Sequence, residues 1–403
     1  MSTADIDLIA TESFASGHPW DQYSWLREHA PVYRHPDPSG GFFWALTKYD
    51  DVRAVSRQPQ LFSSYERGVM IGDPTSDEEL FAQRQMMLNM DPPQHERYRR
   101  LVSRGFTPRQ AQILKDRIDD LAREIVGDVA AKGECDLVSD IAGRLPSGLI
   151  AEMMGIPRAD GERLYELTEI MHTTDPTVAS PERQLEAVAE MLMYADGVAK
   201  TKRAHPADDI ASTLVHSEVD GDVLTDSDFQ WFFLLLVNAG GDTTRNLVAS
   251  GMQLLFDHPD QRALLMSDLD GLIGSTVEEM LRYTSPVSHF CRAVMHDTAI
   301  RGQEIAAGEK VVIFYGAANR DGDVFERPDV FDVGREPNPH LAFGGGGAHL
   351  CLGMHVARVE IASLLRELLT SLPDISPAGE PQRLASSFIV GYHSLPVKFT
   401  PAG

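Results

Sequence analysis

Nearly half of the chain, from Asp91 to about Arg282, shows the apolar periodicity of α-helices. Apolar residues recur there at intervals of three and four, which places them on one face of a helix. The longest uninterrupted stretches run from Pro181 to Ala204 and from Phe229 to Phe256. Proline and glycine mark the breaks between stretches, because both interrupt helices. We therefore expect a mainly α fold.

Shorter segments on either side of this helical region predict a small β-rich part. Extended segments alternate with turns in residues 31–64 and 287–335, and residues 384–400 are typical of a hairpin around Gly391. The stretch from Tyr65 to Met87 lacks periodicity, so we expect a long loop there.

No linker or internal repeat divides the chain. Its 403 residues could form two or three ordinary domains. We instead expect one large domain, residues 1–403, with helices over residues 91–282 and 351–370 and a β-rich part built from both ends of the chain.

The charge balance excludes several classes of partner. The chain carries 36 basic and 60 acidic side chains, a formal net charge of −24. Nucleic acids and anionic membranes select basic surfaces, so we expect neither as a partner. The first residues do not read as a signal peptide, and the longest apolar run, Trp231 to Val237, is too short to cross a membrane. We expect a cytoplasmic protein.

One of the three cysteines lies in a setting that suits chemistry. Cys135, Cys291 and Cys351 are too few and too scattered for a disulfide framework or a structural zinc site. The first two have no role that the sequence supports. Cys351 follows the glycine run 344–347 and should begin a helix, and both features stabilise a thiolate of the kind that binds iron. The alternative is a buried, inert cysteine.

A second motif, NAGGDTTRN, begins at Asn238 inside a long apolar helix. Each glycine in a helix costs about 1 kcal/mol relative to alanine, and the hydroxyl of Thr243 can bond to the carbonyl of Ala239. We expect a local kink at Gly240 that makes room for a flat cofactor, with Asp242 and Thr243 beside it. A bent core helix with a polar pair is the alternative.

Two further motifs pair charged or polar side chains on a helix face. Glu279 and Arg282, in EEMLR, stand three residues apart and read alone as a solvated ion pair. Asp91 should cap a helix on which His95 and Arg99 share one face.

These motifs occur together, and in the same order, in the cytochrome P450 superfamily, which the chain resembles from about Pro19 to Val397. The haem loop of that family reads Phe, Gly, any, Gly, any, His, any, Cys, any, Gly. In this chain Phe343 lies one residue further from the cysteine than usual. That register resembles a bacterial branch that oxidises steroids, branched lipids and terpenoids. The positions that match the loop are Gly345, Gly347, His349, Cys351 and Gly353.

The resemblance implies a haem b cofactor with Cys351 as the axial iron ligand. It implies that Asp242 and Thr243 deliver protons to dioxygen. Glu279, Arg282 and Arg335 would form a structural network under the haem loop. The residues that would contact the haem or its propionates are His95, Arg99, Ala239, Gly240, Arg292, Phe343, Gly345, His349 and Gly353.

The implied reaction is hydroxylation, the insertion of one oxygen atom from O2 into a C–H bond. The sequence shows no strand followed by G-x-G-x-x-G, so electrons from NAD(P)H should arrive through a separate ferredoxin and ferredoxin reductase. We expect a monomer. The acidic ferredoxin would dock on a basic surface formed by Arg97, Arg100, Arg104, Arg109, Arg358 and Arg366.

The expected substrate walls are mostly apolar, which favours a terpenoid, steroid or branched lipid. They comprise Val69, Met70, Ile71, Met86, Leu88, Leu235, Ala239, Val287, Phe290, Phe388, Ile389 and Val390. The segment Thr173 to Pro181 could act as a lid. Oxidation of a polyketide or other natural product, for example epoxidation, is an alternative, as are peroxide-driven chemistry and a non-catalytic haem protein.

Overall fold

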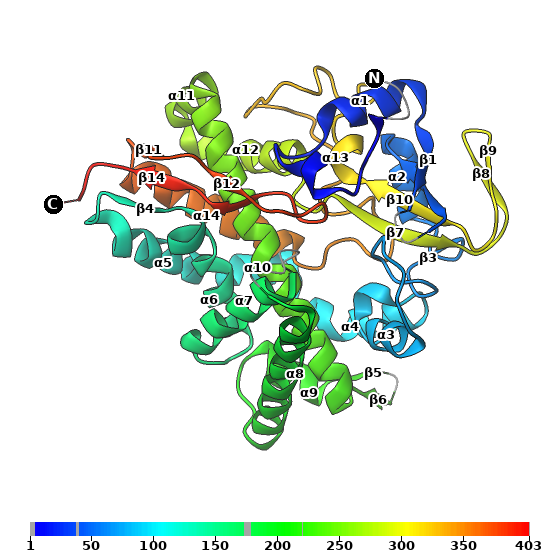
Figure 1. Ribbon diagram of the computed structural model, residues 1–403. Coiled ribbons are helices and arrows are strands. Elements are labelled where there is room, and N and C mark those ends of the chain that lie inside the picture. The colour runs from blue at the N-terminus through cyan, green and yellow to red at the C-terminus, as the bar shows by residue number, and fades with distance from the viewer. Residues whose placement is uncertain (1–4, 38–39, 173–178, 220, 403) are drawn as a thin grey trace.

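One long helix, α10 (Asp226–Asp257), runs through the middle of the molecule (Figure 1). The computed structural model describes residues 5–37, 40–172, 179–219 and 221–402. The helix begins with a capping box: the Thr225 hydroxyl accepts from the Asp228 N–H at 3.1 Å, and the Asp228 carboxylate accepts from the Thr225 N–H at 2.9 Å. This reciprocal pair satisfies N–H groups that a helix end otherwise leaves without partners.

More of the described residues lie in helices than in strands, which confirms the expected mainly α class. The predicted stretch from Pro181 to Ala204 is one helix, and the predicted stretch from Phe229 to Phe256 lies within α10. The remaining helices are α1 (Trp20–His29), α2 (Tyr49–Ser56), α3 (Asp77–Gln83), α4 (Gln94–Val102), α5 (Pro108–Ala130), α6 (Arg144–Met153), α7 (Arg158–His172), α8 (Pro181–Ala204), α9 (Ile210–His216), α11 (Pro259–Ser267), α12 (Leu269–Thr284), α13 (Tyr315–Ala318) and α14 (Met354–Ser371).

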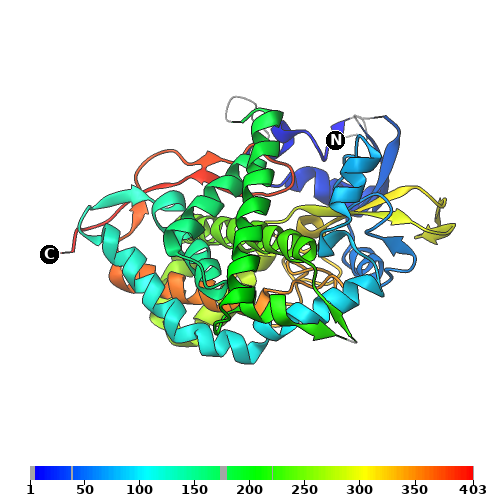
Figure 2. The same cartoon turned by 90° about the horizontal axis from the view of Figure 1, so that it is seen from below.

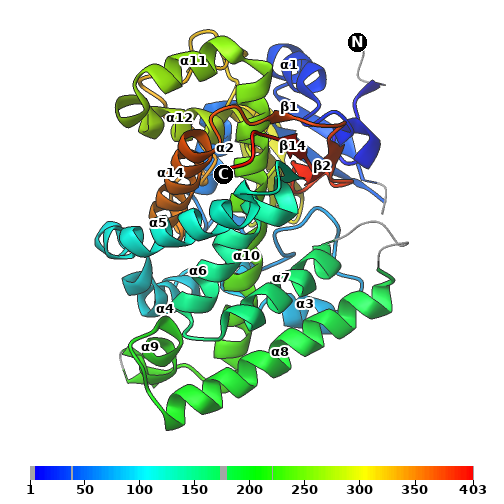
Figure 3. The same cartoon turned by 90° about the vertical axis from the view of Figure 1, so that its left-hand side faces the viewer.

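The helices pack on α10 from two sides. Helix α8 crosses α10, as the view from below shows (Figure 2), while α5 lies along α14 on the other side of the molecule (Figure 3). Ile118 and Ile125 of α5 are fully buried with Leu364 and Leu368 of α14. Each buried side chain of this size contributes about 1.5–3 kcal/mol relative to an exposed one, so this apolar core fixes the helices that surround the site.

A five-stranded sheet lies at the far end of the molecule from α5 (Figure 1). Its order is β1 (Val32–Pro36), β2 (Phe42–Leu46), β10 (Lys310–Phe314), β7 (His289–Val294) and β3 (Phe62–Ser63). β2 and β10 are parallel, and the other neighbours are antiparallel. Residues 31–64 and 287–335 thus both contribute strands, although after Phe314 the second segment forms α13 and turns. The short hairpin of β8 (Thr298–Ile300) and β9 (Gln303–Ile305) lies between β7 and β10 in the chain.

The expected hairpin over residues 384–400 is wrong. β13 (Tyr392–Ser394) pairs with β12 (Gln382–Arg383), whereas β14 (Pro396–Lys398) pairs with β11 (Ser376–Pro377) and with β4 (Glu134–Asp136). Gly391 lies against Asn246 of α10, where a Cβ would overlap the side chain. The Asn246 amide oxygen also accepts from the Tyr392 N–H at 3.1 Å. These contacts hold the turn against α10. The described strands also include the short pair β5 (Glu218–Val219) and β6 (Asp222–Val223).

The stretch from Tyr65 to Met87, expected to be a loop throughout, contains the helix α3. The Ser76 hydroxyl accepts from the Glu79 N–H at 3.1 Å, and three acidic residues occupy the first turn. Acidic side chains stabilise a helix N-terminus. A serine with a glutamate three residues later is a recognised capping signal.

The expectation that Asp91 caps a helix is also wrong. Helix α4 begins at Gln94, and the Asp91 carboxylate instead accepts from the Ser64 N–H at 2.8 Å and from the Ser63 hydroxyl. Asp91 thus fastens the start of α4 to the end of β3. Among the described residues, no helix combines the length and apolar character needed to span a membrane.

Candidate active site

A cavity lies between α10 and the segment that precedes α14. Its empty space measures about 1610 Å³ including its opening to solvent, and its walls are mostly apolar. The polar side chains on its lining are those of His95, Arg99, Thr243, Thr244, Tyr315, His349, Cys351 and Glu360.

The glycines before Cys351 press this segment against α2. Gly344, Gly346 and Gly347 have φ values of +102°, +89° and +77°, a region that disfavours other residues. A Cβ at Gly347 would overlap the carbonyl oxygen of Ser56, which is a backbone atom of α2 and cannot easily move. The Cys351 N–H donates to the Phe343 carbonyl at 2.9 Å and closes the loop.

Cys351 precedes α14 instead of beginning it, since the helix starts at Met354. Burial raises the pKa of the Cys351 thiol, while hydrogen bonds from the Gly353 and Met354 N–H groups and the charges of Arg99 and Arg358 lower it. The N–H groups of the helix start therefore point at the sulfur, as a thiolate requires. A cation bound at the sulfur would complete the stabilisation.

On the facing wall, Thr243 and Ala239 of α10 line the cavity. The Thr243 hydroxyl donates to the Ala239 carbonyl at 2.9 Å, as the sequence predicts. Helix α10 continues without a break through Gly240. A Cβ at Gly240 would lie 2.7 Å from Cδ1 of Ile150, so this glycine lets α6 approach α10 closely.

Asp242 is turned away from the cavity lining. Its Oδ1 lies 3.2 Å from Nη2 of Arg245, which also forms an ion pair with Glu169 of α7. The Arg245 guanidinium lies 5.1 Å from the Tyr165 ring centroid. Asp242 is only 4% exposed. The structure thus separates Thr243, which faces the cavity, from Asp242, which belongs to a buried ion-pair chain linking α10 to α7.

A cationic rim lies on the third side of the cavity, where the rings of His95 and His349 are 4.3 Å apart between centroids. Arg99 donates to the Ala348 carbonyl at 3.1 Å, and Arg292 donates to the Cys291 carbonyl at 2.7 Å. Burial and the neighbouring arginines lower the pKa of His95 to about 4 and that of His349 to about 2. Among the described residues, no carboxylate forms an ion pair with Arg99 or Arg292.

Comparisons with known proteins agree with this geometry. A sequence profile described as Cytochrome P450 matches residues 184–372. The chain is 41% identical to a methyl-branched lipid omega-hydroxylase of Mycobacterium bovis, over 94% of this chain and 90% of the relative. It is 37% identical to a steroid C26-monooxygenase of Rhodococcus jostii, over 98% and 85%. A cytochrome P450 of Mycobacterium marinum, solved in complex with pseudoionone, superimposes with a TM-score of 0.92 at 39% identity, covering 98% of each chain.

The chain belongs to the cytochrome P450 family. The fold expected from the sequence is confirmed, and the protein is a monooxygenase, an oxygen-using oxidoreductase with a haem-thiolate cofactor.

The cavity of this cytochrome P450 fits a haem. Neither Arg99 on the rim nor Arg292 behind it forms an ion pair with a carboxylate, and Nδ1 of His95 is buried without a hydrogen-bond partner among the described residues. The carboxylates of a haem would satisfy these donors. Gly353 also lines the cavity, and a Cβ there would meet no protein atom within 4 Å, so its surroundings leave room for a flat group.

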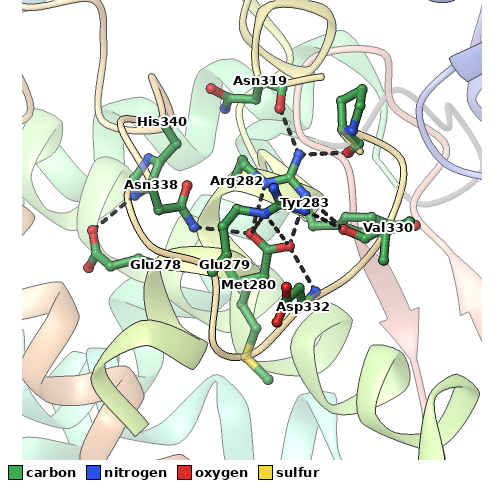
Figure 4. Close-up of polar contacts among 12 residues, drawn as sticks. Glu278, Glu279, Met280, Arg282, Tyr283, Asn319, Val330, Asp332, Asn338 and His340 are labelled. Atoms are coloured by element: carbon green, nitrogen blue, oxygen red, sulfur yellow. Dashed lines mark hydrogen bonds and ion pairs between the residues drawn. The ribbon is translucent and has the colours of Figure 1, made fainter. Parts of the chain in front are cut away.

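The Glu279 network is present as the sequence resemblance implies. Glu279 and Arg282 are both 0% exposed and joined by two hydrogen bonds of 2.8 Å, and Arg335 Nε lies 3.0 Å from Glu279 Oε2. Asn338 and the Asp332 N–H also donate to the Glu279 carboxylate at 3.0 Å (Figure 4). Glu279 thus joins α12 to the segment that leads into the haem loop.

Two of the residues expected at the haem do not line the cavity. Gly345 packs against α2, where a Cβ would lie 2.5 Å from the Ser56 hydroxyl. Arg292 is fully buried behind the rim, and its charge lowers the pKa of His349. The other residues expected at the haem do line the cavity, namely His95, Arg99, Ala239, Gly240, Phe343, His349 and Gly353.

Some of the residues expected to form the substrate walls line the cavity, and others do not. Leu88, Leu235, Ala239, Val287 and Phe290 line the cavity. The residues that do not are Val69, Met70, Ile71, Met86, Phe388, Ile389 and Val390.

Backbone pairing and packing explain most of these misses. The Val69 carbonyl accepts from the Cys291 N–H at 2.7 Å, Ile71 packs in a separate core cluster, and Met70 is 39% exposed. The Phe388 ring packs on that of Phe290, and Ile389 forms a bridge with Val287, which itself lines the cavity. Met86 packs against the apolar core around α8 and α10, and the Val390 N–H donates to the Pro286 carbonyl at 2.8 Å.

The sequence did not predict some of the residues that line the cavity. Phe232 and Leu236 lie on the same face of α10 as Thr243, and helical spacing alone could have found them. Met87, Leu149 and Ile150 come from other elements, and no local signal marks them. The remaining missed residues are Phe106, Met153, Thr244, Leu247, Leu281, Pro286, Tyr315, Ala342, Gly344, Leu350, Leu352, Val356, Ala357, Glu360 and Ile361.

The expected basic surface is divided. Arg100 and Arg109 are exposed at the surface. Arg358 and Arg366 form ion pairs with Glu278 and Asp270 of α12. The Arg104 side chain lies outside the described residues, as does most of the expected lid, residues 173–178.

Proposed function

We propose that this cytochrome P450 hydroxylates an apolar lipid, namely a methyl-branched lipid, a steroid or a terpenoid. The observation that carries the proposal is that Cys351 and Thr243 face one cavity whose walls are mostly apolar. Apolar walls with few polar groups bind apolar ligands. The names of the relatives, which refer to a methyl-branched lipid and a steroid, support the same class.

The chain's own residues would divide the work as follows. Cys351 would hold the haem iron, with its sulfur oriented by the N–H groups of Gly353 and Met354. Arg99, His95 and the charge of Arg292 would hold the propionates. When bound, the haem supplies oxygen activation and the insertion of one oxygen atom into a C–H bond.

Proton delivery would begin at Thr243, whose hydroxyl can donate and accept a proton at Oγ1 on the cavity face. Asp242, one residue earlier on α10, would resupply that proton. Because Asp242 lies beside Arg245, its carboxylate must leave this ion pair, or act through water, to reach Thr243.

We further propose that a ferredoxin, reduced by its NAD(P)H-dependent reductase, delivers the electrons. An acidic protein of this kind would dock near the exposed Arg100 and Arg109. Phe106, which lies between them in the chain, lines the cavity, so this surface is close to the cofactor site.

The proposed function is tested in two steps. The carbon monoxide difference spectrum of the reduced protein reports thiolate ligation of the iron. A shift of the Soret band on titration with methyl-branched fatty acids, steroids and terpenoids then identifies ligands, and product analysis with a surrogate ferredoxin system identifies the oxidised carbon. Shifts only with polyketides would contradict the substrate class. Ligand binding without any product would favour a non-catalytic haem protein.

A further inference from the structure

Three side chains fasten the start of the haem loop to the neighbouring helices. Arg358 of α14 donates to Glu278 of α12 through both Nε, at 2.6 Å, and Nη2, at 2.8 Å. His340, which begins the loop, contacts the same carboxylate at 3.0 Å (Figure 4). We call Glu278, His340 and Arg358 the loop clamp.

The loop clamp acts on the residues that hold Cys351. The Arg358 guanidinium lies 4.6 Å from the Phe343 ring centroid, a distance at which a cation is attracted to a ring face. The Ala342 N–H donates to Nδ1 of His340 at 3.2 Å. The Phe343 carbonyl in turn accepts the N–H of Cys351. The clamp therefore fixes the ring and the backbone on which the position of Cys351 depends.

Charge alone is a weak explanation for this arrangement. Burial raises the pKa of Glu278, but the larger combined effect of Arg358 and His340 lowers it to about 2. The carboxylate is therefore ionised at neutral pH. The positive charge of Arg358 lowers the pKa of the Cys351 thiol, and the negative charge of Glu278 beside it opposes that effect. A bidentate arginine–carboxylate pair mainly adds directional geometry.

We propose that Glu278, His340 and Arg358 are positioning residues, which hold Phe343 in place and through it keep Cys351 in the geometry for binding iron. The proposal rests on the proposed role of Cys351 as thiolate ligand. It gives the partly buried Arg358 a structural role, in contrast to the docking role that the sequence suggested.

Hydrogen exchange of the holoenzyme tests the clamp directly. In Glu278→Gln and in Arg358→Met, the Cys351 N–H should exchange roughly tenfold faster than in the wild type, because its acceptor Phe343 is no longer held. Arg366→Met is the matched control, since it removes another α14–α12 ion pair that does not touch the loop. Equal exchange at Cys351 in the wild type and both clamp variants would overturn the proposal.

A second measurement separates positioning from charge. The urea concentration at which the carbon monoxide complex loses its thiolate spectrum should fall in both clamp variants, and by more than the midpoint of global unfolding. If charge were the cause, Glu278→Gln would leave Arg358 unopposed and strengthen the thiolate, while Arg358→Met would weaken it. Opposite shifts would therefore overturn the proposal.

A conservative variant and the wild type complete the design. Arg358→Lys keeps the charge but loses the planar fork, so it should behave more like Arg358→Met than like the wild type. A wild type without any thiolate spectrum would refute the proposed function. A normal wild-type spectrum with unshifted clamp variants would refute only this inference.

Discussion

At the scale of single residues, two neighbours on α10 have different surroundings although they form one sequence motif. Thr243 is on the cavity lining, whereas Asp242 is held in the ion-pair chain of Arg245 and Glu169. A hydroxyl at the cavity can control where protons go. The structure therefore gives Thr243 the more direct part in the proposed chemistry.

Replacing Thr243 by alanine should uncouple electron use from hydroxylation. The variant should consume reductant at a comparable rate, but the product formed per electron should fall by roughly tenfold or more, with peroxide released instead. Product and peroxide are measured together against NAD(P)H consumed. Thr243→Ser keeps the hydroxyl and serves as the control, and an unchanged yield in Thr243→Ala would contradict this role.

A second residue with unusual surroundings is Glu360 of α14. It lines the cavity, is 5% exposed, and burial raises its pKa from 4.5 to about 8. The folded protein therefore binds this proton more tightly than the unfolded chain does. Ionising Glu360 therefore destabilises the folded protein. This destabilisation is absent below about pH 4.5 and grows as the pH rises through about 8.

Replacing Glu360 by glutamine should stabilise the protein at alkaline pH. At pH 9 the free energy of unfolding should exceed that of the wild type by about 3–5 kcal/mol, and this difference should largely vanish at pH 5. Urea unfolding at both pH values measures it. Glu367→Gln, a more exposed carboxylate on the same helix, is the matched control. A difference for Glu360→Gln that stays constant with pH would contradict the assignment.

At the scale of elements, the buried carboxylate of Glu279 joins α12 to residues 332–338, which lead into the haem loop. Arg282 of the same helix is also fully buried and donates to the carbonyls of Asn319, Pro328 and Val330. Neutralising Glu279 would leave this guanidinium buried without its counter-charge. Breaking a buried pair in this way is strongly destabilising.

The Glu279→Gln variant should lose about 3–5 kcal/mol of the free energy of unfolding. Urea denaturation followed by circular dichroism measures the loss, and haem content should fall with it. Asp120→Asn is the control, because it breaks an exposed pair with Arg123 that is worth at most about 1 kcal/mol. A loss in Glu279→Gln no larger than in this control would contradict the prediction.

Local sequence signals predicted the helices well but failed where pairing is non-local. The long helices carry their own periodicity and caps, so α8 and α10 could be found from the sequence. The expected C-terminal hairpin failed because β14 pairs with β4, more than two hundred residues earlier in the chain. No local pattern encodes such a partner.

In the candidate site, too, the sequence predicts residues within short motifs and does not predict contacts between distant elements. Cys351, His349 and Thr243 belong to short motifs and lie at the cavity as expected. The ion pair of Arg245 with Glu169, by contrast, depends on how α7 packs on α10, and the sequence does not mark it.

At the scale of the whole molecule, the net charge of −24 would oppose the approach of the acidic ferredoxin that we propose as electron donor. Docking therefore depends on local positive charge. Arg100 and Arg109 are exposed near Phe106, a residue of the cavity lining, so they can offset this repulsion close to the cofactor site.

Reversing the charge at Arg109 should slow reduction by ferredoxin about tenfold at low salt, and the difference from the wild type should shrink as salt rises. Stopped-flow reduction across a range of ionic strengths measures this. Arg123→Glu is the control, because Arg123 is exposed on the same helix but about 21 Å further along it. Equal slowing in both variants would indicate an effect of net charge alone.

The contact between Gly347 and α2 has a consequence for protein engineering. Because the obstacle at Gly347 is the backbone of Ser56, no neighbouring substitution can make room for a side chain there. Leu235 and Val287, in contrast, are only partly buried and line the cavity. A mutant library aimed at new selectivity should vary these two wall positions and keep the glycine run constant. Variants with a side chain at Gly347 could not form the loop.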